Sequence, residues 1–233
     1  MLPANRQAVR FGRWRLIVIS WICALCVFCA LPDPADSEQG NGEQGLRNDV
    51  YLSLYALGSW PSNREAFFLT GKAPGTQVGN GAGAGLKVAV FPALARGFIG
   101  IELESFGHSN DISFPITTGP GTGTIGHTNL WVFNSMANLI LRYPHPVLIP
   151  YVGAGAGLSQ GMLTHADIPG RPDTDFESSS TFGYQFLAGV QTNLSRRFFL
   201  FGEYKYFAAN YHWQRLSLEF RSQYALGGIG LRF

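Results

Sequence analysis

The chain has 233 residues, and its 17 basic and 15 acidic side chains give a formal charge of +2. Four arginines lie within the first 15 residues and every acidic residue follows position 30, so the rest of the chain has a formal charge of −2 (13 minus 15). This balance argues against a nucleic-acid partner. The three cysteines lie within the first 30 residues, which leaves no disulfide or cysteine metal site beyond them.

Residues 1–30 differ in composition from everything that follows. Their arginines precede an unbroken apolar run, Leu16–Ala30. This order is typical of a secretory signal peptide, and the run is shorter than the ~20 residues of a spanning helix. A lipoprotein signal fits less well, because Val27 and Phe28 rather than small residues precede Cys29. We therefore predict a cleaved signal peptide over residues 1–30.

Residues 31–48 are rich in Pro, Gly, Glu and Gln and almost devoid of apolar side chains. Such a segment cannot bury enough apolar surface to offset the entropy lost on ordering. We predict a flexible periplasmic segment that leads into one domain over residues 49–233.

Eight later segments alternate polar with apolar residues and are bounded by Gly-, Pro-, Asn- or Ser-rich stretches. A tilted strand of about 9–11 residues crosses a bilayer, whereas a helix needs an apolar run of about 18 or more, which this region lacks. The sequence predicts an all-β fold, an eight-stranded antiparallel transmembrane β-barrel. The predicted strands are Asp49–Trp60, Gly81–Pro92, Phe98–Gly107, Asn129–Arg142, Val147–Leu158, Phe182–Leu194, Phe198–Phe207 and Tyr224–Phe233.

The connections between these segments alternate in length, which is the pattern of outer-membrane barrels with short periplasmic turns and long extracellular loops. A soluble β-sandwich, the alternative fold, has no reason to sort its loops in this way. The long loops are Pro61–Asn80, His108–Thr128, Ser159–Thr181 and Ala208–Gln223. The short turns are Ala93–Gly97, Tyr143–Pro146 and Ser195–Arg197.

Alternation within the strands predicts which side chains face the lumen. Because an eight-stranded barrel is wide enough only for its own side chains, we expect the inward polar residues to form a packed network of salt bridges and hydrogen bonds. A gated channel, in which these pairs exchange partners, is the alternative. The predicted lumen network is Lys87, Glu102, Glu104, Asn138, Glu203 and Lys205.

Outward aromatic side chains lie near the ends of several predicted strands. Amphipathic rings sit well at the level of the lipid headgroups, so those at the long-loop end predict an aromatic girdle. Phe198 and Phe233 are candidates for the opposite girdle. The girdle at the long-loop end comprises Trp60, Trp131, Tyr184 and Tyr206.

The second half of the chain resembles a known family. Pro150–Gly157 reads PYVGAGAG and is similar to a strand of the small OmpA-like outer-membrane barrels. Phe182–Val190 and Phe201–Tyr206 resemble the strands that follow it, and Gly228–Phe233 resembles the terminal strand with its C-terminal Phe. The resemblance implies architecture more than activity, because this fold hosts several functions.

The terminal strand presents Ile229, Leu231 and Phe233 on one outward face. The family resemblance implies that such a strand is a recognition signal for the barrel-assembly machinery. We therefore interpret these three residues as an assembly signal.

Other polar motifs have weaker chemical interpretations. His108 and Ser109 could suggest the nucleophilic pair of a lipid A-modifying enzyme, but their spacing differs from the family motif, and a solvated turn is the preferred interpretation. The loop histidines lack metal-ligand spacing, and we expect no metal and no cofactor. Basic side chains in or beside the loops could meet lipopolysaccharide phosphates: Arg64, Lys72, Arg171, Arg215 and Arg221.

These observations favour a non-enzymatic barrel of the cell outer membrane that serves envelope integrity or surface interaction. A narrow ion or solute channel is the alternative function, and a lipid A-modifying enzyme comes third. The expected partners are outer-membrane lipid and lipopolysaccharide, the barrel-assembly machinery, and an extracellular ligand bound through the loops.

Overall fold

The structure is a computed structural model, in which the predicted signal peptide and nearly all of the predicted periplasmic segment lie outside the described residues. It describes residues 48–62, 66–68, 71–73, 77–117, 123–164, 176–213 and 216–233. No helix in these ranges is long and apolar enough to cross a membrane.

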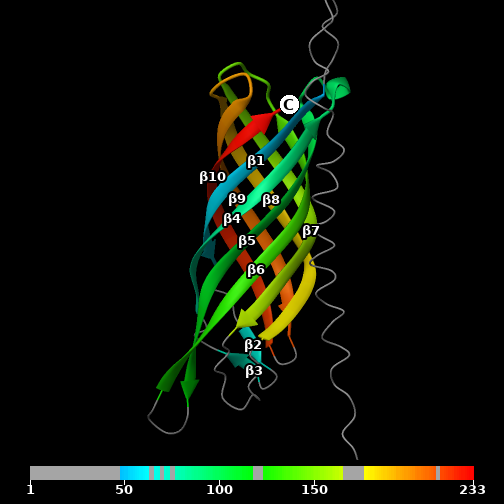
Figure 1. Cartoon of the computed structure of the whole chain (residues 1–233). Coiled ribbons are helices and arrows are strands. Elements are labelled where there is room, and N and C mark those ends of the chain that lie inside the picture. Colours follow the sequence, from blue (N-terminus) through cyan, green and yellow to red (C-terminus); the bar gives the residue numbers. More distant parts are fainter. Residues whose placement is uncertain are drawn as a thin grey trace, which may run out of the picture. The chain divides into compact units, whose positions relative to one another are not determined.

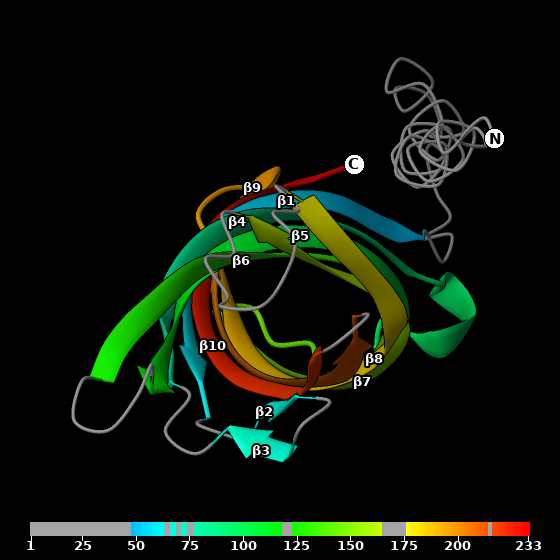
Figure 2. The ribbon, with the colours of Figure 1, turned by 90° about the horizontal axis from the view of Figure 1, so that it is seen from below.

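Eight long strands form one closed antiparallel sheet, as the sequence predicts. Each pairs with its neighbours along the chain, and β1 pairs with β10 from Tyr51↔Arg232 to Pro61↔Ser222, which closes the ring (Figures 1 and 2). Closure leaves no free edge, so the backbone groups are paired without water, as lipid requires. The strands are β1 (Asp49–Pro61), β4 (Gln77–Phe91), β5 (Ile99–Thr117), β6 (Gly123–Arg142), β7 (Leu148–Thr164), β8 (Phe176–Asn193), β9 (Phe198–His212) and β10 (Leu216–Arg232).

Two shorter strands belong to the connection between β1 and β4. Strands β2 (Ala66–Phe68) and β3 (Gly71–Ala73) form a small hairpin, and β2 pairs with the start of β10. At the other end, the β4–β5 connection contains the 3-10 turn η2 (Ala93–Ala95). The C-terminus lies at this same end of the barrel (Figure 1).

The strands run further toward the long-loop end than the sequence analysis predicts, and these boundaries are a correction. Strands β5 and β6 stay paired to Thr117↔Gly123, and β9 and β10 pair from Ser217↔His212 onward. The hairpin of β5 and β6 extends beyond the other strands (Figure 1). Cross-strand backbone hydrogen bonds need no apolar alternation, so the ladder continues where the side chains resemble those of a loop.

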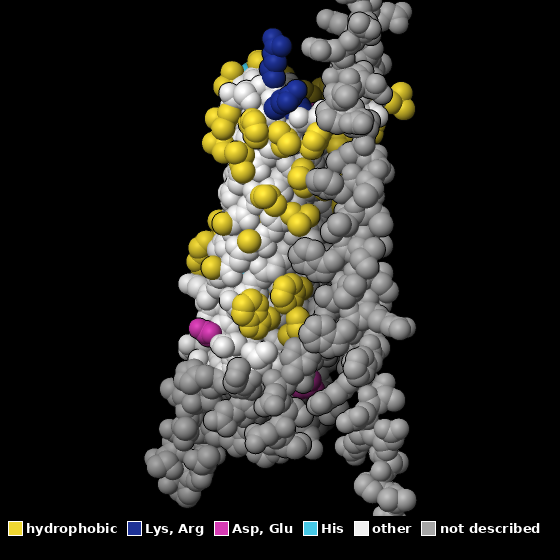
Figure 3. Space-filling model, viewed as in Figure 1, with side chains coloured by type: hydrophobic (Ala, Val, Ile, Leu, Met, Phe, Trp, Pro, Cys, Tyr) yellow, Lys and Arg dark blue, Asp and Glu magenta, His cyan; other side chains and the backbone are white. Residues whose placement is uncertain are grey.

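The alternation of side chains between the two faces follows the predicted parity. On β5 Ile101 is 60% exposed and on β6 Leu139 is 54% exposed, while Glu102 between its outward neighbours is only 4% exposed. The face shown in Figure 3 carries hydrophobic side chains along the barrel and charged side chains toward its ends. An apolar outer wall over a polar interior is the arrangement that a bilayer stabilises.

Inward glycines make room for large side chains on the neighbouring strand. A Cβ on Gly85 would lie 2.4 Å from the ring of Tyr55, and one on Gly189 would lie 2.5 Å from the ring of Tyr151. Each glycine is the direct cross-strand partner of its aromatic residue. The lumen is therefore filled by large residues that lie over glycines, and the barrel can stay narrow.

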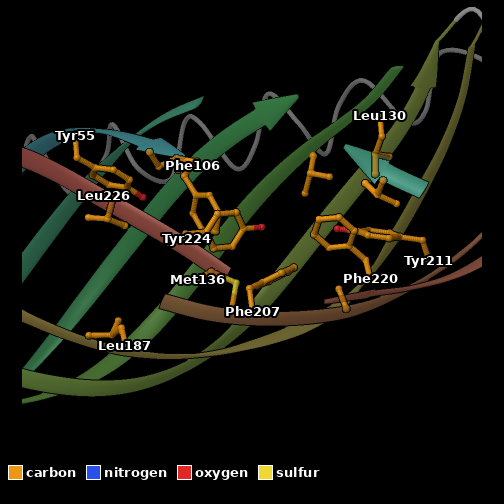
Figure 4. Close-up of a cluster of buried hydrophobic side chains, with 14 of the residues drawn as sticks. Tyr55, Phe106, Leu130, Met136, Leu187, Phe207, Tyr211, Phe220, Tyr224 and Leu226 are labelled. Atoms are coloured by element: carbon orange, nitrogen blue, oxygen red, sulfur yellow. The ribbon is translucent and has the colours of Figure 1, made fainter. Parts of the chain in front are cut away.

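A cluster of buried hydrophobic side chains fills the lumen toward the long-loop end. Aromatic rings from three strands meet there: Phe106 of β5, Phe207 of β9, and Phe220 and Tyr224 of β10 make contacts with centroids about 6 Å apart, and Tyr211 of β9 lies beside Phe220 (Figure 4). Edge-to-face and tilted ring contacts of this kind are favourable beyond the area that they bury. This aromatic layer adjoins the polar residues described next.

Candidate functional site

The six predicted lumen residues meet inside the barrel, and three further side chains join them. Of the eight long strands, all except β10 contribute, and most of the polar atoms are buried. We call the resulting set the lumen network. Its members are Tyr55 (β1), Lys87 (β4), Glu102 and Glu104 (β5), Asn138 (β6), Tyr151 (β7), Gln185 (β8), and Glu203 and Lys205 (β9).

Lys87 bridges the two sides of the lumen. Its Nζ donates to Glu203 Oε2 at 2.7 Å and lies 3.4 Å from Glu102 Oε1 and 3.5 Å from Glu104 Oε1. The residue is only 2% exposed. A buried ammonium needs such partners, because the loss of hydration would otherwise make the charged form very unfavourable.

Lys205 is the second buried cation and is fully enclosed. Its Nζ donates to Glu104 Oε1 at 2.5 Å and lies 3.6 Å from Glu203 Oε1. The same ammonium lies 4.6 Å from the centroid of Phe106, so a ring of the aromatic layer also faces it. Attraction to the ring face supplements the ion pairs.

Amide and hydroxyl groups also donate to the carboxylates of Glu102 and Glu104. Asn138 Nδ2 donates to Glu102 Oε1 at 2.9 Å, Gln185 Nε2 donates to Glu104 Oε2 at 2.7 Å, and the Tyr55 hydroxyl donates to Glu104 Oε1 at 2.6 Å. Neutral donors around a buried carboxylate lower the cost of its desolvation. The contacts of Tyr55 and Gln185 with Glu104 also join β1 and β8 to β5, with which neither shares a backbone ladder.

Tyr55, Tyr151 and Gln185 are absent from the predicted network. The Tyr151 hydroxyl donates to Glu203 Oε2 at 3.0 Å, and the other two residues contact Glu104. Their inward parity is visible in the sequence, where Gln185 opposes the apolar face of its strand. Their depth is not visible, because depth depends on the stagger between strands.

The two buried lysines face three buried glutamates, so the network holds one carboxylate more than it has cations. Every charged group has an oppositely charged partner within 3.6 Å. Such a dense set of ion pairs in a narrow lumen crosslinks the wall. It also occupies the path that a solute would need.

The structure corrects the interpretation of His108 as part of a solvated turn. His108 belongs to β5, is 1% exposed and faces the lumen beside the aromatic layer. Its Nδ1 lies 2.6 Å from Asn110 Oδ1, which can only accept, so Nε2 accepts from the Tyr224 hydroxyl at 2.9 Å. Ser109, the next residue of the strand, faces the opposite side, so the two do not form a nucleophile–base pair.

The predicted girdle residues lie on the outer wall. Trp60, Trp131 and Tyr184 are 43–46% exposed and Tyr206 is half-buried, with Trp131 stacked on its neighbour Phe133. Phe198 and Phe233, the candidates for the opposite girdle, are likewise outward and exposed.

Several predicted residues lie outside the described side chains. Of the basic residues assigned to lipopolysaccharide, Arg221 is described, and its Nη2 lies 2.6 Å from Glu219 Oε1. Within the described residues, no group of three or more His, Cys, Asp or Glu could hold a metal ion. The predicted side chains that are not described are Arg64, Lys72, Arg171 and Arg215.

Comparison with known proteins places this architecture among solved structures. No protein-family model matches the chain, and no curated protein matches it. Neisserial surface protein A aligns with a TM-score of 0.53 at 15% identity, over 79% of this chain and 97% of that one. The outer membrane protein OprG of Pseudomonas aeruginosa aligns with 0.48 at 12% identity, over 80% and 95%. Ail of Yersinia pestis aligns with 0.44 at 16% identity, over 80% and 99%.

At such identities the likeness concerns the fold alone. The ring closed by β1 and β10, the apolar wall and the polar interior agree with it. The chain has the fold of the small eight-stranded outer-membrane β-barrels.

Proposed function

We propose that this protein is a non-enzymatic, non-conducting barrel of the outer membrane that presents its long-loop end at the cell surface. The single observation that carries this proposal is the filled lumen. The lumen network joins seven strands, and the aromatic layer lies beside it. An ion that crossed the barrel would have to break buried ion pairs and displace packed rings, both of which are costly.

The outer wall supports the membrane location. Large apolar side chains such as Leu54, Ile101 and Phe186 are 56–60% exposed, which is unfavourable in water and favourable in lipid. The paired ends of β5 and β6 continue eight residues beyond Ser109↔Trp131, at the level of the girdle residue Trp131. They would therefore stand in the medium outside, where they can meet another surface.

The absence of a His108–Ser109 pair favours a non-enzymatic role over lipid A modification. Both nitrogens of His108 are used within the lumen, by Asn110 and Tyr224, and the ring is buried away from the lipid face. A base held in this way cannot reach an acyl ester at the membrane surface.

Planar-bilayer recordings test the proposal. The purified full-length protein is expected to insert without stepwise conductance, whereas discrete current steps would favour the channel alternative. In parallel, cells that carry a variant with β5 and β6 shortened beyond Asp111 and Asn129 should keep barrel levels and lose binding to target surfaces. If shortening leaves binding intact but dye uptake rises when the whole protein is deleted, envelope integrity is the better assignment.

A further inference from the structure

A second polar site lies at the short-turn end of the barrel, apart from the lumen network. A pocket with a volume of about 330 Å³ opens there, between the ends of several strands and the turn that joins β6 to β7. Two prolines and an isoleucine form part of its wall. Its polar lining is Asp49, Arg142, His145, Asn193 and Arg232.

Arg142 is the fixed element of this pocket. Its Nε donates to the Gly97 carbonyl at 2.7 Å, its Nη2 donates to Asp49 Oδ2 at 2.6 Å, and its guanidinium carbon lies 3.6 Å from the centroid of Phe91. The side chain is only 7% exposed, yet its Nη1 has no hydrogen-bond partner. A buried, preorganised guanidinium with an unused donor is poised for an acceptor from outside.

Asp49 and Arg232 leave further hydrogen-bonding capacity unused. Arg232 Nε lies 3.0 Å from Asp49 Oδ1, but the two atoms do not make a well-aligned hydrogen bond, and both are buried without one. Arg232 Nη2 makes only a long contact of 3.4 Å with Asn193 Oδ1. The pocket lining therefore contains two donor atoms and one acceptor atom that make no hydrogen bond, although Arg232 Nε and Asp49 Oδ1 are ion-paired with each other.

The charges of the lining define what would fit. Two guanidinium groups face one carboxylate, so Arg142, Arg232 and Asp49 together carry a net charge of +1. His145 is held as an acceptor, because its Nδ1 accepts the backbone N–H groups of Val147 and Leu148 at 3.4 Å. A monoanion neutralises this charge, whereas a phosphate dianion would leave a net charge of −1 in a site that already contains the Asp49 carboxylate.

Among monoanions, a carboxylate matches the fork of an arginine through two parallel hydrogen bonds. Asp49 Oδ1 is ion-paired with Arg232 but accepts no hydrogen bond, so its lone pairs can in addition take up an N–H group close to that carboxylate. We propose that this pocket binds an α-carboxylate with its adjacent N–H, as offered by the carboxyl-terminal residue of a peptide or by a free amino acid. Its volume lies at the lower end for small-ligand pockets, which suits one or two residues.

Calorimetric titration of the full-length protein in detergent micelles tests this inference, with alanine, the dipeptide Ala-Ala, Ala-Ala amide and inorganic phosphate as probes. We expect saturable binding of Ala-Ala or alanine, and binding of the amide at least ten-fold weaker because it lacks the carboxylate. If Ala-Ala binds more tightly than alanine, the ligand is the carboxyl-terminal end of a peptide. If alanine binds more tightly, the ligand is a free amino acid.

Variants link the binding to the pocket. Arg232→Gln should weaken Ala-Ala binding at least ten-fold, and Arg232→Lys should be intermediate because it keeps the charge but loses the fork. Arg221→Gln on the same strand, far from the pocket, is the matched control and should bind as the unaltered protein does.

Three outcomes would overturn the proposal: no saturable binding of either carboxylate probe, equal binding of Ala-Ala and its amide, or tighter binding of phosphate. The comparison of probes uses the unaltered protein, so it tests the proposal even if the Arg232→Gln variant fails to assemble. The site is independent of the proposed non-conducting role, since a failed titration would leave the bilayer recordings unchanged.

Discussion

Glu104 is the side chain on which the lumen network converges. It accepts from Tyr55, Gln185 and Lys205 within 2.7 Å, and Asn138 lies at 3.2 Å. Glu102, by contrast, has one amide donor at 2.9 Å and a cation at 3.4 Å. Since the network has three carboxylates for two lysines, Glu102 is the carboxylate whose charge contributes least.

Removing a buried cation should therefore cost far more than neutralising Glu102. Lys87→Met leaves Glu203 and Glu102 without their nearest ammonium, and breaking a buried pair in this way typically destabilises by about 3–5 kcal/mol. Glu102→Gln keeps the shape and removes the excess charge, so its free energy of unfolding should change by less than about 1 kcal/mol. Denaturant titration of both variants in micelles measures the difference.

A compensating variant supplies the control for this experiment. Lys87→Met combined with Glu203→Gln should recover part of the lost stability, because the carboxylate left unpaired by the first change is removed by the second. Strictly additive losses would contradict the contact between these two residues.

For single residues, the sequence predicts well which face of the sheet a side chain occupies, and poorly which side chains it contacts. Parity alone assigns Lys87, Glu102 and Glu104 to the lumen, and the structure places them there. It cannot rank their contacts: Lys87 lies nearest to Glu203 on β9, a strand with which its own strand β4 has no ladder. Contacts across the lumen depend on strand tilt and stagger, which a single sequence does not display.

Among the elements, the long-loop halves of the strands were the hardest to predict. His108, Asn110 and Ile112 are inward and buried in continuation of the pattern on β5, but the segment is rich in Gly, Ser and Asn, like a loop. Beyond the lipid, the outward face has no need to be apolar, so the contrast that reveals a strand disappears. The short-turn ends, where alternation and Pro or Gly punctuation coincide, agree with the predicted boundaries within two residues.

The last strand carries a prediction of its own. Ile229 and Phe233 are exposed on its outer face, Leu231 is half-exposed, and β10 closes the ring against β1. If this stripe is the assembly signal, deletion of Phe233 should lower the amount of assembled barrel several-fold and leave export intact. Fractionation of outer-membrane and periplasmic protein measures both quantities.

Leu231→Asp should resemble the deletion of Phe233, because it places a charge on the face that meets lipid. Arg232→Gln, one residue further and inward, should be milder. Assembly of the Phe233-deleted chain at the level of the unaltered protein would remove the role assigned to this stripe.

For the whole molecule, closure is the property that the sequence predicts best. Eight alternating segments and sorted loops suffice for the architecture, and the same fold appears in Neisserial surface protein A at only 15% identity. Specific side chains can vary so widely because the constraint is physical: every backbone group must be paired inside lipid, which a closed ring achieves. The ligand bound at the long-loop end cannot be predicted in the same way, because no comparable physical constraint fixes the sequence of the segments beyond the lipid.

Closure also predicts how the protein behaves on a detergent gel. The unheated protein should migrate differently from the boiled one, since a ring without a free edge resists unravelling. Gly228→Ala should lower the heat-modifiable fraction, because its Cβ would lie 2.2 Å from the Leu54 carbonyl oxygen at the seam between β1 and β10.

Gly202→Ala is the matched control, because a Cβ there meets nothing within 4 Å. It should retain the mobility of the unaltered protein. If both variants behave alike, the seam is not as tightly packed as the structure indicates.

The pairing of inward glycines with large cross-strand neighbours has a consequence for how this sequence can drift over evolutionary time. At Gly85–Tyr55, Gly189–Tyr151 and Gly230–Phe199, enlarging the glycine is sterically barred unless the partner shrinks. Homologues should therefore exchange bulk across each pair, with a larger residue on one strand and a smaller one opposite. Such correlated changes would identify which residues are cross-strand partners. A set of homologous sequences could then give the stagger between strands, which a single sequence does not.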